Sequence, residues 1–455
     1  MPGRSGKATL IGMMNVATLA KATPVTRDRY IDLLRVLSLG VVVLGHWLMA
    51  VVVVGADGSV RATNLLAVQP ALQPVTWLLQ VMPVFFLVGG FSHATACASL
   101  ERRGGRYADF VRSRAGRLLR PTAVFAGVWL VLALLIELLG ADTGVLKLAT
   151  RVVAQPLWFV GVYLGIVALA PAMLRLHRWS GRWAPVVPLA FGAAAGLVDV
   201  ARFAYDVPYV AFLNLAFVWL GVHQVGFLYA DGLFRNRRLP LVLLVTGLAG
   251  TVLCTTVGPY PTSMVGMPGE KVSNMSPPTF ALAMCAVSLI GLTMLLRGPV
   301  TRWLDRPAVW RGVIAANGLA MTAFLWHLTA MFLATAAVLA VGVTLPAVGS
   351  GAWWLLRPVW LGVLVALTAA LVAAFRGADR PRATTVGARG TGFAIGGMVL
   401  CTLGVLGFSA VGFGGLLAGR TATLIVLPVT PLTAALLVAG GAALLRATRP
   451  VTAAA

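Results

Sequence analysis

The chain has 455 residues, of which 59% are hydrophobic and only 11% are charged, and its mean hydropathy is +0.90. A soluble protein carries about a quarter charged residues, so the composition excludes a soluble enzyme and favours a multi-pass α-helical membrane protein whose solvent is the lipid bilayer. The net charge of +23 does not indicate a nucleic-acid partner, because the basic residues lie between apolar runs, where the positive-inside rule places them.

Apolar runs of about 20 residues recur along the chain, and each is long enough to cross a bilayer as a helix. Twelve spans are predicted, over residues 30–54, 72–97, 120–140, 154–174, 184–202, 209–230, 239–257, 278–297, 313–342, 355–375, 391–417 and 422–446. An even number places both termini on one side. The connections on that side hold 28 Lys and Arg against 7 on the other, which predicts that both termini are cytoplasmic.

The predicted order is a cytoplasmic tail (1–28), a ten-span core (29–376), a basic linker (377–390) and two further spans (391–449). The last two are rich in Gly, Ala and Val and carry no titratable residue inside the membrane, so we expect an accessory role for them. The longest outer connection, residues 258–278, is rich in Pro, Gly, Ser and Asn. It either covers an outward-facing site or is simply a loop.

The first span, DLLRVLSLGVVVLGHWLMA (32–50), carries three groups that hydrocarbon disfavours. Arg35 and His46 are 11 residues apart, close to three helical turns, so both side chains project from one face about 16 Å apart. Asp32 lies three residues before Arg35, within pairing distance on a helix. His46 lies deep in the span without a predicted partner, and such an intramembrane group indicates either a functional site or a histidine that holds helices together.

The other histidines carry weaker signals. His177 lies in a basic connection and is expected to be solvated, whereas His223, in the sixth span, is expected to pack or to line a pocket. The four cysteines are far apart, and no spacing of histidines and carboxylates indicates a metal site. We therefore expect no metal and no tightly bound cofactor.

The first span has Arg35, ten intervening residues and then His46, and it begins with YIDLLR. This pattern resembles the family-3 integral-membrane acyltransferases of bacteria. These enzymes transfer acyl groups, often acetyl, from coenzyme A to sugars and lipid-linked glycans of the cell envelope. The resemblance implies that His46 is the essential catalytic histidine and that Arg35 is the arginine of the paired motif.

Three other spans are similar to segments of this family. MPVFFLVGGFSHA (82–94) is similar to a second span that usually ends in Ser-Gly-Phe, but here Gly-Gly-Phe replaces it and a hydroxyl is missing. PLWFVGVYLGIVALAP (156–171) resembles the fourth span with its tryptophan, Trp158, although the glutamate that many members carry after it is absent. FLWHLTAMF (324–332) is like the late histidine motif, with His327 in place.

The basic segment between the second and third spans matches the family's Arg-x-x-Arg pair in two registers, Arg114/Arg117 and Arg117/Arg120. Coenzyme A carries a diphosphate and a 3′-phosphate, and guanidinium groups bind phosphate through paired hydrogen bonds. We therefore expect Arg114, Arg117 and Arg120 to bind acyl-coenzyme A from the cytoplasm. His327, Trp158 and His93 are candidates for the surrounding pocket.

Together these features predict an enzyme of the bacterial inner membrane. His46 would act as general base on the hydroxyl of a sugar or lipid-linked acceptor, with acyl-coenzyme A as co-substrate. A covalent relay through His46 is the other possibility, but it demands a second protected step. A proton-coupled exporter of an amphipathic metabolite, using Arg35, His46 and His327 as a relay, is the alternative function. The acceptor, the acyl chain length, the role of the last two spans and the oligomeric state stay open.

Overall fold

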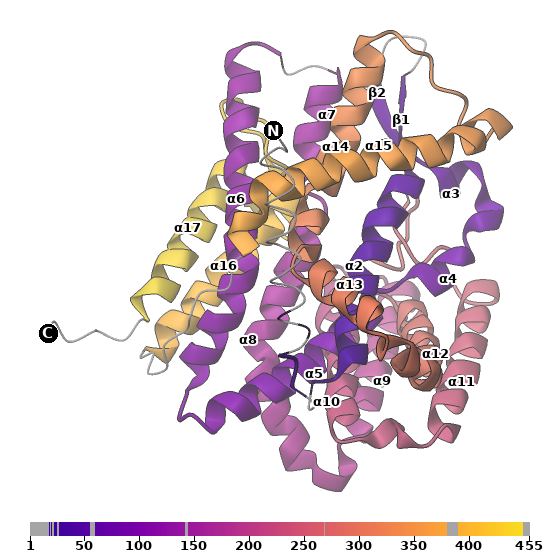
Figure 1. The fold of residues 1–455 in the computed structure, drawn as a ribbon, viewed down its shortest axis with the longest axis vertical. Helices are drawn as coiled ribbons and strands as arrows, with labels where there is room; N and C mark the ends of the chain where they lie inside the picture. Colours follow the sequence, from indigo (N-terminus) through magenta and orange to yellow (C-terminus); the bar gives the residue numbers. More distant parts are fainter. Residues whose placement is uncertain are drawn as a thin grey trace, which may run out of the picture.

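The computed structural model describes residues 18, 20, 22–24, 27–54, 60–141, 144–267, 269–379 and 390–448. Within them the regular secondary structure is helical apart from two short hairpins, and the predicted all-α multi-pass fold is confirmed (Figure 1). Most of the predicted tail (1–28) and of the predicted linker (377–390) lies outside the described residues.

Twelve long helices make up most of the structure: α2 (Arg29–Met49), α5 (Met82–Glu101), α6 (Tyr107–Leu138), α8 (Leu157–Ser180), α9 (Val186–Ala204), α10 (Asn214–Ala230), α11 (Arg238–Thr256), α12 (Phe280–Leu304), α14 (Ala320–Ala340), α15 (Gly351–Phe375), α16 (Thr391–Val411) and α17 (Pro431–Ala447). Four short helices connect them: α3 (Leu65–Val68), α4 (Val75–Leu79), α7 (Gly144–Val152) and α13 (Pro307–Asn317). Single 3-10 turns are η1 (Pro70–Leu72), η2 (Gly181–Trp183), η3 (Val210–Leu213), η4 (Leu233–Arg235) and η5 (Arg376–Asp379). The antiparallel hairpins are β1 (Ala50–Val54) with β2 (Val60–Asn64), and β3 (Ala422–Leu424) with β4 (Leu427–Val429).

One long helix falls in each predicted span, but some boundaries differ. Among the described residues, eleven helical segments are long and apolar enough to cross a membrane, and α17, with 17 residues, is shorter. The predicted first span ends early because residues 50–54, AVVVV, form strand β1; consecutive β-branched side chains favour an extended backbone. The predicted last span begins late because residues 422–429 form a hairpin.

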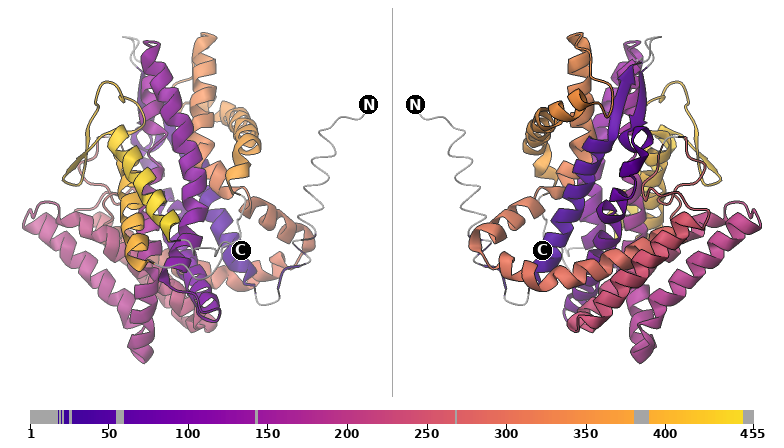
Figure 2. Two further views of the ribbon diagram at one scale, coloured as in Figure 1. Left: turned by 90° about the vertical axis from the view of Figure 1, so that its left-hand side faces the viewer. Right: turned by 90° about the vertical axis from the view of Figure 1, so that its right-hand side faces the viewer.

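Helix α15 lies across α14 and α6 rather than alongside them, and one view shows it nearly end-on (Figures 1 and 2). Its contact with the rest of the molecule includes Phe375, whose ring stacks on that of Trp326 with 4.0 Å between centroids. Most of its apolar side chains face outward; Leu355 is 80% exposed. Such a surface is suited to lipid rather than to water.

Small residues allow the closest helix contacts, as is usual in membrane proteins. Gly90 on α5 faces Gly226 on α10, and a Cβ added at Gly90 would lie 2.0 Å from the carbonyl oxygen of His223. The contact between α16 and α17 is similar, because a Cβ at Gly441 would lie 2.6 Å from the sulfur of Cys401. These backbones therefore leave no room for even a methyl group.

Two acidic side chains tie separate segments together by accepting hydrogen bonds from backbone N–H groups. Asp199 on α9 is buried and accepts from the N–H of Phe280 at 2.7 Å and from the amide of Asn214 at 2.9 Å. Glu137, near the end of α6, accepts from the N–H groups of 415–417 in the connection after α16. Both carboxylates thus have structural partners.

The last two helices attach to the rest of the chain through α16. Its Leu406 fills the space over Gly161 of α8, where a Cβ would lie 2.6 Å from the leucine Cγ. Phe413, just after α16, is fully buried among Phe125 and Trp129 of α6. The expected accessory function of α16 and α17 stays a prediction.

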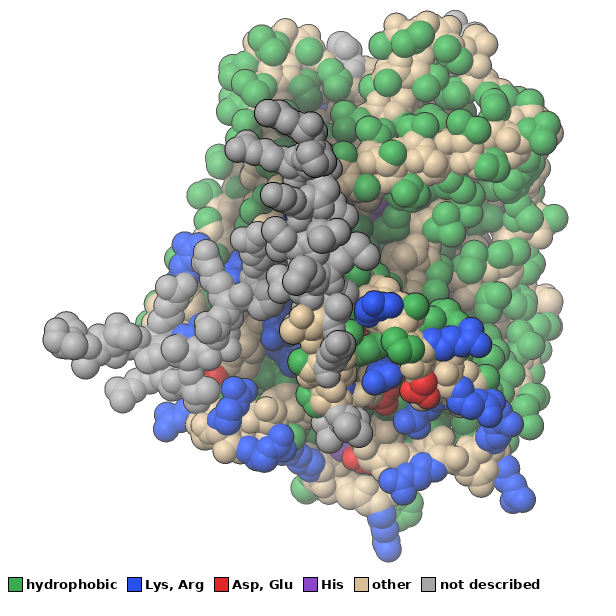
Figure 3. Space-filling model, in the orientation of Figure 1, with side chains coloured by type: hydrophobic (Ala, Val, Ile, Leu, Met, Phe, Trp, Pro, Cys, Tyr) green, Lys and Arg blue, Asp and Glu red, His purple; other side chains and the backbone are tan. Residues whose placement is uncertain are grey.

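Charged side chains are distributed unevenly over the surface. On the face shown in Figure 3, Lys and Arg gather in the lower part, while the upper part is almost wholly apolar. Both α2 and α6 carry their arginines toward their N-terminal ends, which brings Arg35 and Arg114 into the same part of the molecule.

Candidate active site

The first turns of α2 hold a network of charged groups. Asp28 caps the helix by accepting hydrogen bonds from the N–H groups of Tyr30 and Ile31. The predicted pair of Asp32 and Arg35 is present, with 3.2 Å between Oδ1 and Nη1, and the other carboxylate oxygen of Asp32 lies 2.6 Å from Nε of Arg27. Asp32 is buried, so its charge is balanced by both arginines and is held in one orientation.

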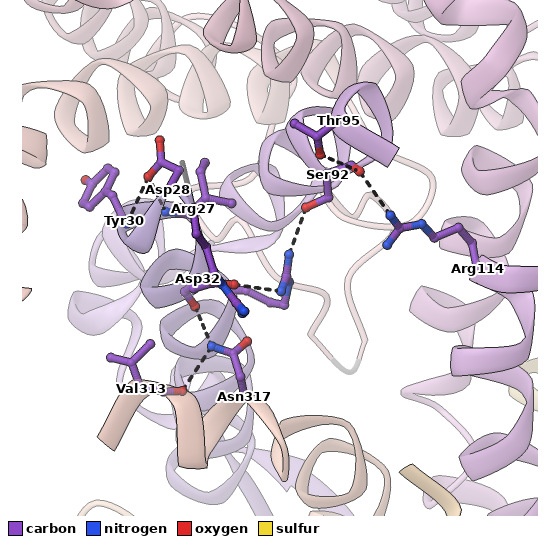
Figure 4. Close-up of polar contacts among 11 residues, drawn as sticks. Arg27, Asp28, Tyr30, Asp32, Ser92, Thr95, Arg114, Val313 and Asn317 are labelled. Carbon is purple, nitrogen blue, oxygen red and sulfur yellow. Dashed lines mark hydrogen bonds and ion pairs between the residues drawn. The ribbon is translucent and has the colours of Figure 1, made fainter. Parts of the chain in front are cut away.

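Ser92 of α5 connects the arginine of α2 to an arginine of α6 (Figure 4). The Ser92 hydroxyl accepts from Nη2 of Arg35 at 2.9 Å, and the Ser92 carbonyl accepts from Nη2 of Arg114 at 3.4 Å. Ser92 follows Gly-Gly-Phe directly, so this part of α5 does present a hydroxyl to Arg35. Sequence reasoning overlooked Ser92, whose only signal was its place immediately after that motif.

The three predicted phosphate-binding arginines are placed differently along α6. Arg114 is half-buried and reaches Ser92, Arg120 is half-buried, and Arg117 is exposed. The structure brings Arg114 together with Arg35, whereas Arg117 lies on the outer surface of the same helix. Only part of the donor capacity of Arg35 and Arg114 is used by these contacts, since a guanidinium has five N–H groups.

His46 pairs with His327 of α14 at the other end of α2. Nδ1 of His46 lies 2.9 Å from Nε2 of His327, and the two rings stack with 5.0 Å between centroids. The next residue, Trp47, also binds α14, because its indole N–H donates a hydrogen bond to the backbone carbonyl of His327 at 3.0 Å. Residues 281 positions apart in sequence are thereby held in one cluster.

The hydrogen bonds around His327 assign the protons of both imidazoles. Nδ1 of His327 lies 2.5 Å from the carbonyl oxygen of Phe324, which only accepts, so this nitrogen carries a hydrogen. In neutral His327 the Nε2 atom is then an acceptor, and Nδ1 of His46 must be the donor to it. The remaining nitrogen of His46, Nε2, is left with a free lone pair. This is the arrangement that a general base requires.

His46 lines a chamber of about 260 Å³. Its walls come from α2, from the segment between β2 and the start of α5, from the first turns of α8, α14 and α15, and from the connection between α11 and α12. Trp158, one of the predicted pocket residues, is also in the wall, together with Phe324 and Met49. The lining is mostly aliphatic and aromatic.

The long connection between α11 and α12 forms part of this wall. Trp77 donates to the carbonyl of Thr262 at 2.8 Å, and Gln80 donates to that of Met264 at 2.6 Å. Met264 is fully buried, and the connection places Val265 and Met275 in the lining of the chamber. Of the two interpretations of residues 258–278, the structure favours the one in which they cover a site.

A second pair of imidazoles lies apart from the chamber. Nδ1 of His93 on α5 is 2.9 Å from Nε2 of His223 on α10, and both residues are buried. The hydroxyl of Tyr163 lies 3.5 Å from the other nitrogen of His93, in space that Gly89 leaves open. Of the three predicted pocket residues, Trp158 lines the chamber, His327 contacts it through His46, and His93 is not among the lining residues.

His177 was expected to be solvated, and this is wrong. It is buried near the end of α8, where its Nε2 lies 2.7 Å from a carboxylate oxygen of Asp231 and its Nδ1 lies 2.9 Å from the amide of Gln224. The basic residues next to His177 in the sequence indicated a solvated segment. They lie on other faces of α8, near its C-terminal end, and His177 points inward. Among the residues that the structure describes, no group of three or more His, Cys, Asp or Glu side chains is arranged to hold a metal ion.

Comparison with known proteins identifies the family. The family model described as "Acyltransferase domain", that of acyltransferase family 3, matches residues 28–377, which is most of the chain and includes α2 through α15. No curated protein and no solved structure matches the chain significantly. On the strength of the family match, this multi-pass membrane protein belongs to acyltransferase family 3 and is a transferase of acyl groups.

Proposed function

We propose that the protein moves an acyl group from acyl-coenzyme A to a hydroxyl of a sugar, a glycolipid or a related acceptor at the bacterial plasma membrane, with His46 as the general base. The observation that carries this proposal is the hydrogen-bond chain from His46 through His327 to the Phe324 carbonyl, which leaves Nε2 of His46 unprotonated beside the chamber.

The reaction proceeds by direct transfer. Nε2 of His46 takes the proton of the acceptor hydroxyl while the hydroxyl oxygen attacks the thioester carbonyl carbon. The carbon–sulfur bond then breaks, and the thiolate of coenzyme A takes this proton from the imidazolium of His46. The products are an ester and a free thiol. His327 accepts the Nδ1–H of His46 throughout, which orients the ring and stabilises its transient positive charge.

The arginines at the other end of α2 bind the phosphates of the donor. Arg35 and Arg114 converge on Ser92 from two helices and keep unused N–H donors. Arg117 and Arg120 extend the positive surface along α6. At a rise of 1.5 Å per residue, Arg35 lies about 16 Å along α2 from His46. The donor therefore enters from the arginine end and presents its thioester to His46.

The test uses purified protein in detergent with radiolabelled acyl-coenzyme A and an envelope extract. We expect release of free thiol together with labelling of an acceptor, and we expect His46→Ala to abolish both. His177→Gln is the matched control, since it removes a buried histidine far from the chamber. Full activity in His46→Ala would remove His46 as the base.

The same experiment separates the enzyme from the transport alternative, because turnover in detergent needs no sealed compartment. Asp199, which is buried, and Glu137, which is half-buried, both accept hydrogen bonds from backbone N–H groups, so neither extends the Arg35, His46 and His327 relay of the transport alternative. Solute movement into sealed vesicles without any thiol release would favour transport.

A further inference from the structure

We propose, resting on the function proposed above, that the chamber beside His46 holds the acyl chain of the donor and that this chain is longer than acetyl. The group that fits is a straight or branched saturated chain of about four to eight carbons. This assigns a substrate class to the enzyme that family membership leaves open.

The size of the chamber is the first argument. Its volume is about 260 Å³, whereas an apolar cavity of about 150 Å³ is enough to bind benzene. An acetyl methyl group would leave most of this space empty, and empty apolar space forfeits contacts with the walls. A chain of several methylenes fills it.

The chemistry of the lining is the second argument. Among the described residues that line the chamber, the polar side chains are His46, Thr76, Gln80 and the indoles of Trp158 and Trp354. The Thr76 hydroxyl donates to the Gln73 carbonyl at 2.6 Å and accepts from the N–H of Met264 at 2.9 Å. The amide nitrogen of Gln80 is engaged by Met264. The hydroxyls of a sugar would therefore find few partners, and burying them unpaired is costly.

The position of the chamber favours the donor's chain over an apolar part of the acceptor. The chamber wall on α2 begins at Val41, between Arg35 and His46, and continues past His46 to Met49. A donor held by its phosphates at Arg35 with its thioester at His46 directs the acyl chain further along the same line. The chain therefore passes into the part of the chamber lined by Met49, Leu65 and Leu66.

Gly45, next to the proposed base, keeps this space open. It lines the chamber, and a Cβ added there would meet only the terminal carbon of Met49, at 3.7 Å. Glycine inside a helix costs about 0.5–1 kcal/mol relative to alanine, and nothing in the backbone packing at this position requires it. A larger side chain at position 45 would grow into the chamber without a clash with the backbone.

The test measures kcat/KM for acetyl-, butyryl-, isovaleryl-, hexanoyl- and octanoyl-coenzyme A with purified protein and an envelope extract. Burial of a methylene corresponds to up to about fourfold in affinity, so we expect kcat/KM to rise from acetyl to a maximum within the series. Gly45→Leu should lower the ratio of hexanoyl to acetyl kcat/KM at least tenfold. Gly40→Leu is the control on the same helix, since Gly40 is exposed and has nothing within 4 Å.

Leu72→Trp is a second variant that fills the chamber from the peripheral turn η1, in case Gly45→Leu does not fold. A preference for acetyl in the unaltered protein would overturn the inference while leaving the proposed function intact. Unchanged chain preference in both filled variants, with a higher KM for the acceptor, would assign the chamber to the acceptor and also overturn it. Absence of thiol release from every thioester would instead contradict the proposed function itself.

Discussion

At the scale of single residues, the imidazole pair explains how a histidine without a carboxylate partner can serve as a base. In many hydrolases an acidic group orients the catalytic histidine. In the proposed mechanism His327 takes that place, and the Phe324 carbonyl fixes its tautomer. A neutral orienting group costs less to bury in a membrane protein than a carboxylate does.

Substitution of His327 tests this orientation. We expect His327→Leu to lower kcat about 100-fold, because the Nδ1–H of His46 loses its acceptor, with little change in the KM for acyl-coenzyme A. His327→Gln offers an amide oxygen near the position of Nε2 and should recover part of the activity. Equal losses in kcat for the two variants would mean that His327 only packs.

The arginines make a second prediction, because the two Arg-x-x-Arg registers place different residues near the donor. Arg114 meets Arg35 through Ser92, whereas Arg117 is exposed. We expect Arg114→Gln to raise the KM for acyl-coenzyme A about tenfold, since a hydrogen bond to a charged group contributes about 1.5–3 kcal/mol. Arg117→Ala should raise that KM less. A larger effect at Arg117, or an effect on acceptor use alone, would contradict this placement.

The sequence could predict the local part of the site but not the part made by distant segments. Asp32 and Arg35 are three residues apart, so helical geometry alone pairs them. The pairing of His46 with His327 depends on how α2 meets α14, and Ser92 reaches Arg35 only because α5 crosses α2 at that level. The burial of His177 likewise depends on α10. No pattern within one helix carries this information.

At the scale of the elements, hydrophobicity predicted the helices and glycine decides how they pack. The apolar runs located every long helix, since length and composition determine which segments a bilayer accepts. They did not locate the ends, where AVVVV becomes a strand and residues 422–429 become a hairpin. Runs of apolar residues suit either structure, so periodicity alone does not distinguish them there.

The contact of α5 with α10 gives a prediction at this scale. Gly90→Ala would place a methyl group against the carbonyl of His223, so the helices must separate. We expect the free energy of unfolding to fall by about 1–3 kcal/mol, measured as a lower apparent Tm in detergent. Gly127→Ala on α6 has nothing within 4 Å of its added methyl group, and we expect it to leave the Tm unchanged or raise it. Equal effects of the two substitutions would contradict this account of the contact.

At the scale of the whole molecule, the open question is which end faces the cytosol. The arginines of the proposed donor site meet at the N-terminal ends of α2 and α6, and on the face shown in Figure 3 Lys and Arg gather toward one end. Coenzyme A is a cytosolic metabolite, so the proposed mechanism requires that this end is cytoplasmic. The positive-inside rule independently predicts that the end rich in Lys and Arg is cytoplasmic. Helix α15 lies across the other long helices (Figure 1), so counting apolar runs does not by itself establish the side of the C-terminus.

Thiol labelling in intact cells tests this orientation directly. Cys254 is half-exposed and the other three cysteines are buried, so a Cys254→Ala background leaves little native reactivity. In that background, a cysteine replacing exposed Arg103, between α5 and α6, should react with a membrane-impermeant maleimide only after permeabilisation. A cysteine replacing exposed Lys271, in the connection that walls the chamber, should react in intact cells. The reverse pattern would put the arginines outside, where acyl-coenzyme A is absent, and the proposed donor route would then be wrong even if His46 proved essential.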